Sequence, residues 1–571
     1  MRLALAQINT TVGALDRNRA RILGRLEEAR ATGADLVLFP ELAVTGYPPE
    51  DLLLRPGFVR AAEESLAEIA RATHGIVALV GFPHFDRDLY NACAVCTAGE
   101  VKAIYRKRFL PNYGVFDEDR YFAPARDLLL LEHGGTLIGP TICEDMWQPG
   151  APATDLALAG AQLLTNISAS PFHVGRDRER EEMFATRARD NSCFVAFCNC
   201  VGGQDELIFD GHSLVLDEEG HVLARASGFE EALLVVDIDP ADAVGRRLRD
   251  VRRRALVRER EAVPEAPVVH IGVSKSHGDA VRPPLATPLE ELEQMRLALE
   301  LGLRDYVEKN GFRDVVVGVS GGIDSAVTAA LAVEALGAER VHCISMPSRY
   351  SSDDTRGDAR LLSERLGTDF RELPIDEIVQ ALEGTLAESF AGRQPDLAEE
   401  NLQARVRGVL LMALSNKFGW LVVATGNKSE LSVGYATLYG DMAGGFALLK
   451  DVFKTDVFRL ARHLNERAGG ELIPVSIIER APSAELRDNQ LDEDSLPPYP
   501  ALDLVLEAYV EQDRSREELS ADGFDRDVVD RALALIDRAE YKRRQAPPGV
   551  RLTPKAFGRD RRTPITNQWR G

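Results

Sequence analysis

Residues 315–325 read VVVGVSGGIDS, and this stretch decides the architecture of the C-terminal half of the chain. Its three valines predict a buried strand, and the alanine-rich run SAVTAALAVEALG from residue 325 predicts a helix. Glycines between a strand and a helix let backbone N–H groups approach an anion closely, and the helix N-terminus adds a favourable dipole. We therefore expect a phosphate to bind at this junction.

The loop also differs from the commonest phosphate loop. It lacks the Gly-Lys-Ser/Thr ending of a Walker A motif, so the lysine that grips a γ-phosphate is absent. The alternative is a tight turn without a ligand, but Asp324 and the neighbouring hydroxyl groups favour phosphate. The sequence therefore indicates a nucleotide chemistry of another kind.

Two α/β domains extend on either side of a proline-rich stretch. Near-continuous apolar runs such as WLVVATGN predict a second, parallel sheet covered by helices, and LALAQI, DLVLFPE and IVALVGF predict a layered α/β domain before it. The 571 residues exceed the usual size of one core. We expect domains at 1–261 and 288–571, joined by a linker at 262–287 whose prolines interrupt regular structure.

Two further local predictions concern this boundary. Thr287-Pro288-Leu289-Glu290 has the form of a capping box, so a helix should begin there. The arginine-rich segment 246–261 could bind an anion, but a solvated connecting helix is the preferred interpretation.

Composition limits the function classes. With 68 Lys and Arg against 90 Asp and Glu, the net charge of −22 argues against nucleic-acid or acidic membrane partners. No run of about 18 apolar residues predicts a membrane span, and polar residues interrupt the N-terminal apolar stretch before it could serve as a signal peptide. Seven cysteines are too few for a disulfide scaffold. We expect a cytoplasmic enzyme that acts on small molecules.

The phosphate loop SGGIDS resembles the loop of ATP-pyrophosphatases, which cleave ATP between its α- and β-phosphates. The segments NLQARVRG, ATGNKSELSVGYATLYGDMAGGF, KDVFKTDVF, APSAELR and EYKRRQAPPG, in this order, resemble the NAD synthetase family. The resemblance covers most of residues 288–571 and implies a doubly wound, parallel-sheet domain of the adenine nucleotide alpha hydrolase-like type. It also implies that ATP adenylates the carboxylate of deamido-NAD and that ammonia then displaces AMP.

The same resemblance implies roles for individual residues. It implies these contacts with ATP: Gly318, Val319, Ser320, Gly321, Gly322, Ile323, Asp324, Ser325, Thr425, Lys454 and Ser483. It implies these contacts with deamido-NAD: Asn401, Glu430, Tyr435, Asp441 and Lys542. Asp324 and Glu430 match the carboxylates that bind Mg²⁺ in the family. Members that use free ammonia carry lysine where this chain has Leu438, so the resemblance does not identify the cation that contacts the dinucleotide.

Three chemically complementary residues follow apolar runs in the first half. Glu41 follows DLVLF, Lys107 lies in YRKRFLP and Cys143 lies in GPTICED. A thiolate is a strong nucleophile, an ammonium stabilises anions, and a carboxylate can act as a base. Taken singly, each has an ordinary alternative: a buried thiol, a solvated lysine or a helix-cap carboxylate. Together they favour amide hydrolysis through a thioester.

The contexts of these residues, in the order Glu, Lys, Cys, are similar to the nitrilase superfamily over about residues 1–260. FPELAVTGYPPEDLL and LPNYGVFDEDRYF resemble the glutaminase domains that are fused to NAD synthetases. The resemblance implies an αββα sandwich, a catalytic triad of Glu41, Lys107 and Cys143, and glutamine contacts at Tyr113, Ser170 and Arg176. Glu118 would be the accessory carboxylate.

The sequence thus predicts a glutamine-hydrolysing ligase that passes ammonia from one site to the other. Two alternatives remain: an amidotransferase making GMP or asparagine, and a silent nucleotide-binding scaffold. Cys93 and Cys96 have the spacing of a redox or metal pair, but core packing is preferred for them and for Cys198 and Cys200. The family resemblance also implies a homo-oligomer.

Overall fold

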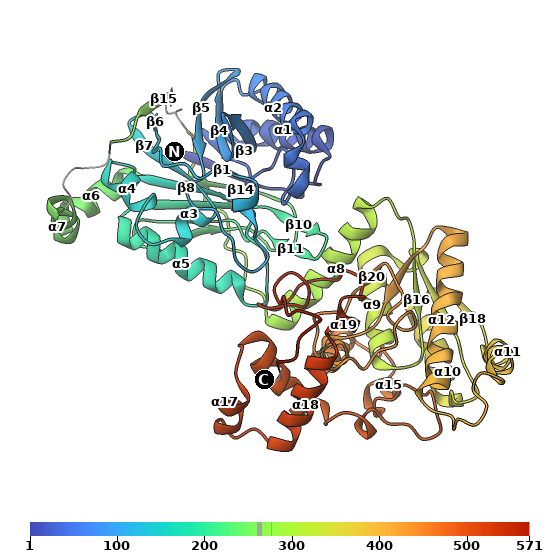
Figure 1. Ribbon diagram of the computed structural model, residues 1–571. Coiled ribbons are helices and arrows are strands. Elements are labelled where there is room, and N and C mark those ends of the chain that lie inside the picture. The colour runs from blue at the N-terminus through green and yellow to red at the C-terminus, as the bar shows by residue number, and fades with distance from the viewer. Residues whose placement is uncertain (260–264, 274, 276, 570–571) are drawn as a thin grey trace. The chain divides into compact units, whose positions relative to one another are not determined.

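The computed structural model describes residues 1–259, 265–273, 275 and 277–569, without the side chains of residues 252 and 259. The chain forms two compact units, shown in Figure 1. Unit 1 comprises Met1–Gln204 and Ile208–Leu289, and unit 2 comprises Asp205–Leu207 and Glu290–Gly571.

Unit 1 contains two large sheets packed face to face. The first has the strand order β14-β1-β2-β3-β4-β5. Its strands are β1 (Arg2–Gln7), β2 (Leu36–Leu38), β3 (Val77–Asp86), β4 (Asp88–Thr97), β5 (Glu100–Arg106) and β14 (Ala232–Asp237). The second sheet has the order β13-β12-β9-β8-β7-β6-β15. Its strands are β6 (Leu130–His133), β7 (Thr136–Ile142), β8 (Leu163–Ser168), β9 (Phe194–Asn199), β12 (Leu214–Leu216), β13 (Val222–Arg225) and β15 (Val268–Gly272). A separate hairpin joins β10 (Val201–Gln204) to β11 (Leu207–Asp210).

The alternation of side chains along the strands builds the layers. Leu3 and Leu5 of β1 pack into the core between the sheets, beside Ile138 and Leu163 of the second sheet. Ala4 and Ala6 instead face the outer helices of the first sheet. Those helices are α1 (Leu15–Ala31) and α2 (Pro56–Arg71). In Figure 1 they lie beside β3 and β4, whereas α4 (Ala153–Leu158) and α5 (Arg176–Asn191) lie along the other sheet. The predicted αββα sandwich is confirmed.

The arginine-rich segment is helical over its described part. It forms α6 (Ala241–Arg249) and α7 (Val251–Glu259), and residues 260–261 lie outside the described residues. Arg253 donates a 2.7 Å hydrogen bond to the carbonyl oxygen of Ala157, and Arg247 donates to the carbonyl oxygen of Gly160 at 3.2 Å. Some of these arginines therefore fasten the helices to unit 1 instead of being solvated.

Part of the segment predicted as a linker is a strand of unit 1. Val268–Gly272 form β15, which pairs in parallel with β6. This run lies between prolines, so its N–H groups are free to pair, and Ile271 is buried in the core between the sheets. Residues 262–264, 274 and 276 lie outside the described residues. The capping-box prediction is wrong, because α8 (Glu291–Lys309) begins after Glu290, whose side chain makes no cap hydrogen bond.

Unit 2 is built on five parallel strands in the order β18-β17-β16-β19-β20. They are β16 (Val315–Gly318), β17 (Val341–Ser345), β18 (Asp369–Glu372), β19 (Leu421–Ala424) and β20 (Phe446–Ala447). The helix α9 (Ile323–Leu336) packs on β16 and β17 together with α8 and α14 (Lys454–Ala468), and α12 (Leu397–Phe418) packs on β16 and β19. Val316 and Val422 pack with α12 residues, including Val406 and Leu411, in one cluster. The predicted doubly wound sheet is confirmed.

Shorter helices complete unit 2. They are α10 (Asp353–Leu366), α11 (Asp376–Leu386), α13 (Lys428–Val433), α15 (Val475–Glu479), α16 (Tyr499–Leu506), α17 (Arg516–Ala521), α18 (Arg526–Arg538) and α19 (Glu540–Arg543). The strand β16 is central, with a parallel neighbour on either side, so the crevice at its carboxyl end is where ligands bind in open α/β sheets. The SGGIDS loop occupies that end.

Candidate active sites

A buried cluster of charged side chains lies where three strands of unit 1 end. Lys107 directly follows β5, Cys143 directly follows β7, and Glu41 lies in the turn after β2. The Nζ atom of Lys107 lies 2.6 Å from Oε1 of Glu41, and both side chains are fully buried. The structure thus brings together Glu41 and Lys107, which the sequence predicted to act together.

The Glu41 carboxylate accepts three hydrogen bonds. Its Oε1 atom accepts from Lys107 and, at 2.7 Å, from the side-chain amide of Asn91. Its Oε2 atom accepts from the backbone N–H of Ala169 at 2.9 Å. Three N–H donors fix the orientation of this carboxylate.

Glu118 is the second carboxylate on Lys107. Lys107 donates to both of its oxygens at 2.9 Å, and the Tyr47 hydroxyl donates to its Oε1 at 3.0 Å. Burial raises the pKa of Glu118 to about 7, although the Lys107 charge opposes that shift. Burial lowers the pKa of Lys107, but Glu118 and Glu41 outweigh it and hold that pKa well above its usual range. Lys107 therefore stays charged, and Glu118 can carry a proton near neutrality.

Cys143 sits in a sharp turn at the start of the short helix α3 (Glu144–Trp147). Its φ is +40° and its ψ is −101°, a conformation that costs about 1–3 kcal/mol for a residue with a side chain. Its N–H donates to the carbonyl oxygen of Ile167 at 3.0 Å, which ties the turn to β8. Burial and the charge of Glu41 raise the pKa of the Cys143 thiol well above its usual range, with Lys107 opposing them. The resting thiol is protonated and needs a base.

The residues predicted to contact glutamine surround this turn. The hydroxyl of the exposed Tyr113 donates to Glu144, the residue after Cys143, at 2.9 Å. Arg176, at the start of α5, stacks 4.0 Å from the ring centroid of Trp147 in α3. Burial and Glu144 raise the pKa of Tyr113, and the positive charge of Arg176 opposes them. Tyr113 and Arg176 therefore both contact the short helix α3 that follows Cys143.

Ser170 lies in the segment that directly follows β8. It is buried, and its N–H donates to Oδ1 of Asn199 at 2.9 Å. The preceding residue, Ala169, provides the backbone hydrogen bond to Glu41. Ser170 is therefore connected to Glu41 through its neighbour Ala169.

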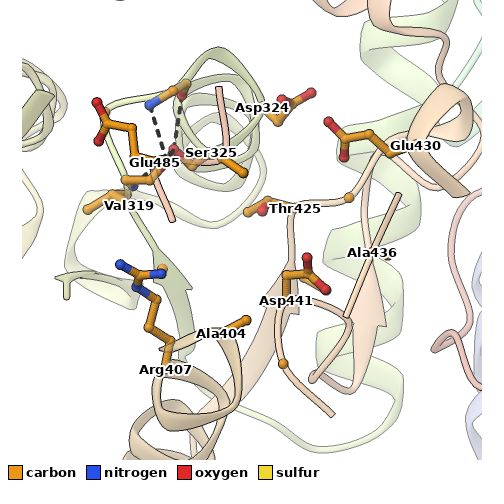
Figure 2. Close-up of a pocket in the computed structure, with 18 of the residues that line it drawn as sticks. Val319, Asp324, Ser325, Ala404, Arg407, Thr425, Glu430, Ala436, Asp441 and Glu485 are labelled. Atoms are coloured by element: carbon orange, nitrogen blue, oxygen red, sulfur yellow. Dashed lines mark hydrogen bonds between the residues drawn. The ribbon is translucent and has the colours of Figure 1, made fainter. Parts of the chain in front are cut away.

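Unit 2 contains a cavity of about 300 Å³ at the carboxyl end of β16. All eight residues of Gly318–Ser325 line it, as do the other residues predicted to contact ATP: Thr425, Lys454 and Ser483. Glu430, Tyr435 and Asp441 line it as well. Figure 2 shows Asp324, Thr425, Glu430 and Asp441 around the same space.

The phosphate loop needs glycine at one position in particular. Gly321 has a φ of +83°, and a Cβ atom there would lie 2.2 Å from the carbonyl oxygen of Thr355. The Oγ atom of Ser320 accepts from the N–H of Gly322 at 3.2 Å, and Oγ of Ser325 donates to the carbonyl oxygen of Gly322 at 3.0 Å. The loop is thus shaped in advance beside the N-terminus of α9, as anion binding requires.

Asp324 and Glu430 share one lysine in the cavity wall. Lys454, a buried residue at the start of α14, contacts Asp324 and lies 3.2 Å from Oε1 of Glu430. The side-chain amide of Asn427 donates to Oδ1 of Asp324 at 2.8 Å. Burial raises the pKa of Glu430 to about 8, although Lys454 opposes that shift. A further cation between these carboxylates would stabilise both of their charges.

Two residues predicted to contact deamido-NAD do not line the cavity. Oδ1 of Asn401 accepts from the Thr437 hydroxyl at 2.8 Å, and Nζ of Lys542 donates to the carbonyl oxygens of Gly434 and Ala436, each at 2.7 Å. Both side chains therefore support the wall segment 434–441. Leu438 belongs to this segment.

Comparisons with known proteins cover the whole chain. A family model for carbon-nitrogen hydrolases matches residues 2–247, and one for NAD synthases matches residues 296–546. The glutamine-dependent NAD(+) synthetase of Thermotoga maritima is 47% identical over 100% of this chain and 99% of that protein, and the one of Aquifex aeolicus is 46% identical over the full length of both. The chain belongs to the glutamine-dependent NAD(+) synthetase family.

A solved structure of this family gives the same result. The glutamine-dependent NAD(+) synthetase of Acinetobacter baumannii, in complex with ADP, is 40% identical with a TM-score of 0.75, and the alignment covers 100% of this chain and 99% of that one. Membership makes the chain a carbon–nitrogen ligase with ATP and glutamine as substrates. Among the described residues, no helix has the length and apolar character to cross a membrane.

The donor set at Asp324 and Glu430 fits the magnesium ion that the synthetase family implies. Mg²⁺ is commonly held by one or two carboxylates together with substrate phosphates, and these two carboxylates lie beside the phosphate loop. Within the described part of the chain, no group of three or more His, Cys, Asp or Glu side chains is arranged to hold a metal ion. Asp324 and Glu430 would hold such an ion together with the phosphates of a nucleotide.

The sequence analysis missed several residues of the cluster in unit 1 and of the cavity in unit 2. Asn91 in unit 1 was missed, and Arg407, Arg480 and Glu485 line the cavity of unit 2. Figure 2 shows Arg407 and Glu485 on the side of the cavity away from Glu430. Arg407 lies in the segment NLQARVRG, so its place in a segment that resembles the NAD synthetase family was the available signal.

The remaining cysteines match their prediction. Cys93, Cys96, Cys198 and Cys200 are buried and free of disulfides. Cys93 belongs to the core between the sheets, and Cys96 packs on the outer face of the first sheet. Core packing is therefore confirmed for both members of the Cys93–Cys96 pair.

Proposed function

We propose that Glu41, Lys107 and Cys143 hydrolyse glutamine in unit 1. Sγ of Cys143 attacks the amide carbon, and its proton passes to Glu41 and then to the leaving nitrogen, which departs as ammonia. Lys107 stabilises the negative charge on the amide oxygen during this attack. Glu41 next takes a proton from water, the water oxygen attacks the thioester carbon, and glutamate leaves as the proton returns to sulfur.

The observation that carries this proposal is the buried contact between Lys107 and Glu41 beside a protonated thiol. Three N–H donors hold the Glu41 carboxylate in one orientation, in which it would accept the thiol proton. Tyr113, Ser170 and Arg176 would hold the glutamine. Arg176 would pair with the carboxylate of the glutamine, beside α3, which Tyr113 also contacts through Glu144.

In unit 2, ATP and deamido-NAD would meet in the cavity at the carboxyl end of β16. The carboxylate oxygen of deamido-NAD attacks the α-phosphorus of ATP and pyrophosphate leaves, which gives an acyl-adenylate. Ammonia attacks the acyl carbon, AMP leaves, and NAD forms. The residues Gly318–Ser325 would bind the phosphates, with Thr425 and Ser483 on the nucleotide.

The charged residues of this cavity would hold the reacting groups together. Mg²⁺, bound to Asp324 and Glu430, would supply positive charge where the polyphosphate and the carboxylate meet. Lys454 contacts both carboxylates and would adjust its contacts as the phosphates arrive. Tyr435, Asp441, Asn401 and Lys542 would form the dinucleotide side of the cavity, the last two through the segment 434–441.

Ammonia would pass between the sites without release into bulk water. Ammonium has no lone pair for attack on an acyl carbon, and ammonia is largely protonated near neutral pH. A hydroxylamine trap, together with the ratio of glutamate to NAD formed, tests this transfer. Free ammonia equal to the glutamate released during turnover would count against it.

We also propose a cytoplasmic homo-oligomer with domains at 1–261 and 288–571, the first of which is completed by β15 from the segment between them. These proposals rest on the family resemblance, the composition and the proline-rich boundary. Sedimentation analysis of the purified chain tests the oligomeric state.

The whole reaction can be tested directly. Purified protein receives ATP, Mg²⁺, deamido-NAD and glutamine, and the products are separated by chromatography. We expect NAD, AMP, pyrophosphate and glutamate in equal amounts. Unchanged deamido-NAD would contradict the proposed function.

A further inference from the structure

Asn91 contacts all three charged residues of the buried cluster in unit 1. It lies in β4, between β3 and β5, and its side chain is buried. The side-chain Nδ2 atom of Asn91 lies 2.7 Å from Oε1 of Glu41 and 3.5 Å from Oε2 of Glu118. The backbone carbonyl oxygen of Asn91 accepts from the backbone N–H of Lys107 at 2.8 Å. The residue therefore lies between the two carboxylates and holds the backbone of the lysine that joins them.

The two carboxylates are chemically alike, so the cluster needs a feature that distinguishes them. Lys107 approaches Glu41 at 2.6 Å and both oxygens of Glu118 at 2.9 Å, so its charge supports either as an anion. Only one of them can be the base that takes the Cys143 proton at a fixed position. Asn91 breaks the symmetry, because its short hydrogen bond goes to Glu41 and its long contact goes to Glu118.

The orientation of the Asn91 amide is determined by its surroundings. If the amide were turned over, Oδ1 would face the Glu41 oxygen at 2.7 Å, and two acceptors would repel each other. In the observed orientation Oδ1 is buried and has no hydrogen-bond partner among the described residues. An unpaired buried acceptor is unfavourable, so the site accepts that cost in order to direct the N–H group at Glu41.

We propose that Asn91 is a positioning residue that assigns the role of general base to Glu41 and leaves Glu118 as the carboxylate that takes up a proton. This inference rests on the proposed glutaminase function of unit 1. Asn91 acts through Glu41, since its amide donates to the carboxylate and its backbone anchors Lys107.

The titratable groups around Asn91 come from several elements. They are Glu41 after β2, Tyr47 beyond it, Lys107 after β5, Glu118 in the 3₁₀ turn Glu118–Arg120 and Cys143 after β7. The raised pKa of Glu118, caused first by burial, agrees with its role as the protonated partner. The two neighbouring carboxylates also favour the protonated form of a third carboxyl group placed at position 91.

The test compares Asn91→Leu and Asn91→Asp in the full-length protein. Asn91→Leu removes the donor and keeps a similar volume. Asn91→Asp keeps the shape, and its carboxyl can donate an O–H to Glu41 only while it is protonated. Glutamine hydrolysis is measured as kcat and KM over a range of pH, ammonia-supported NAD formation is measured in parallel, and Cys143→Ala serves as the reference.

We expect Asn91→Leu to lower kcat for glutamine about 10- to 100-fold at every pH, with KM nearly unchanged, because a hydrogen bond to a charged group is lost. The rate of Asn91→Asp relative to the native protein should rise as the pH falls, because protonation restores the donor. Ammonia-supported NAD formation should persist in both variants. If Asn91→Leu does not fold, the inference is tested by Asn91→Asp alone, through the pH dependence of its rate relative to the native protein.

Two results would overturn the inference. One is a native kcat and pH profile in Asn91→Leu while Cys143→Ala is inactive with glutamine. The other is an Asn91→Asp ratio that does not change with pH, which would indicate a merely structural role. Full glutamine-dependent activity in Cys143→Ala would instead contradict the proposed glutaminase function itself, so the two failures are distinguishable.

Discussion

The ammonium group of Lys107 lies 2.6 Å from a carboxylate oxygen of Glu41, and neither side chain is exposed to solvent. Buried charges persist only when they are paired and hydrogen-bonded, and breaking such a pair leaves an uncompensated charge. Burial lowers the pKa of Lys107, but Glu118 and Glu41 hold that pKa well above its usual range, so the lysine is charged before glutamine arrives. In the proposed mechanism, Glu41 would be the base and Lys107 the electrostatic donor beside the Cys143 turn, without any rearrangement of the cluster.

Glu41→Gln tests the base. The substitution keeps the size of the side chain and removes its capacity to take a proton, so we expect glutamine hydrolysis to fall about 10²- to 10⁴-fold. Glutamate release is the measurement. Glu63→Gln is the matched control, because Glu63 lies in the same unit as a partly exposed side chain 3.5 Å from His84. Equal rates in the two variants would contradict the role of Glu41.

Glu118→Gln tests the proton on the accessory carboxylate. Burial raises the pKa of Glu118 to about 7, so the group is neutral below that pH and negative above it. The negative form of Glu118 opposes the negative charge that forms on sulfur, whereas a glutamine at this position stays neutral. We therefore compare kcat/KM for glutamine in Glu118→Gln and in the native protein. The ratio of the variant to the native value should rise as the pH increases through 7. A ratio that is constant over this range would exclude Glu118 as the titrating group.

The sequence was informative where the chemistry lies in contiguous motifs at strand ends. The SGGIDS loop and the residues Glu41 and Lys107 each follow an apolar run, so the strand pattern alone placed them at the edge of a sheet. The alternation of strands and helices predicted a layered α/β domain in each half, and the family resemblance added the αββα arrangement of the first. The family resemblance then added roles that no spacing contains.

The sequence was not informative where a contact depends on strand pairing. Asn91 is 50 residues from Glu41, and it meets the cluster because β4 pairs with both β3 and β5. The strand β15 was missed because the prolines around it dominated the pattern. Arg180 and Asp210 likewise form a buried ion pair between α5 and β11 that neither local sequence indicates.

Glu430→Gln tests the magnesium site of unit 2. The amide is a poorer ligand than the carboxylate, so we expect the Mg²⁺ concentration for half-maximal ammonia-supported NAD formation to rise by at least about tenfold. Glu466→Gln, on the exposed face of α14, is the matched control. An unchanged Mg²⁺ requirement in Glu430→Gln would contradict the assignment.

Asp210→Asn tests the stability of unit 1. Asp210 contacts Arg180 and lies 2.8 Å from Nδ1 of His212. We expect a loss of about 3–5 kcal/mol in the free energy of unfolding, because the Arg180 charge would remain buried without its partner. The loss is measured by denaturant unfolding of the transition that belongs to unit 1. Asp86→Asn, which removes an exposed ion pair with Arg106, should change little.

The contribution of Asp210 to stability should also depend on pH. Burial alone would raise the pKa of Asp210, but Arg180 and His212 lower it to about 2. A lowered carboxyl pKa gives stability that is complete above the unfolded pKa of about 4 and disappears as the pH falls toward 2. The difference between native protein and Asp210→Asn should therefore shrink over this range. A difference that stays constant would contradict the lowered pKa.

The most direct measurement is NAD formation by a Cys143→Ala variant supplied with either glutamine or ammonium. The account predicts that glutamine supports no NAD formation, because the nucleophile is gone. It also predicts that ammonium supports native rates, because the adenylation site in unit 2 does not use the thiol. Loss of both activities, or retention of the glutamine-dependent one, would contradict a separate source of ammonia at Cys143.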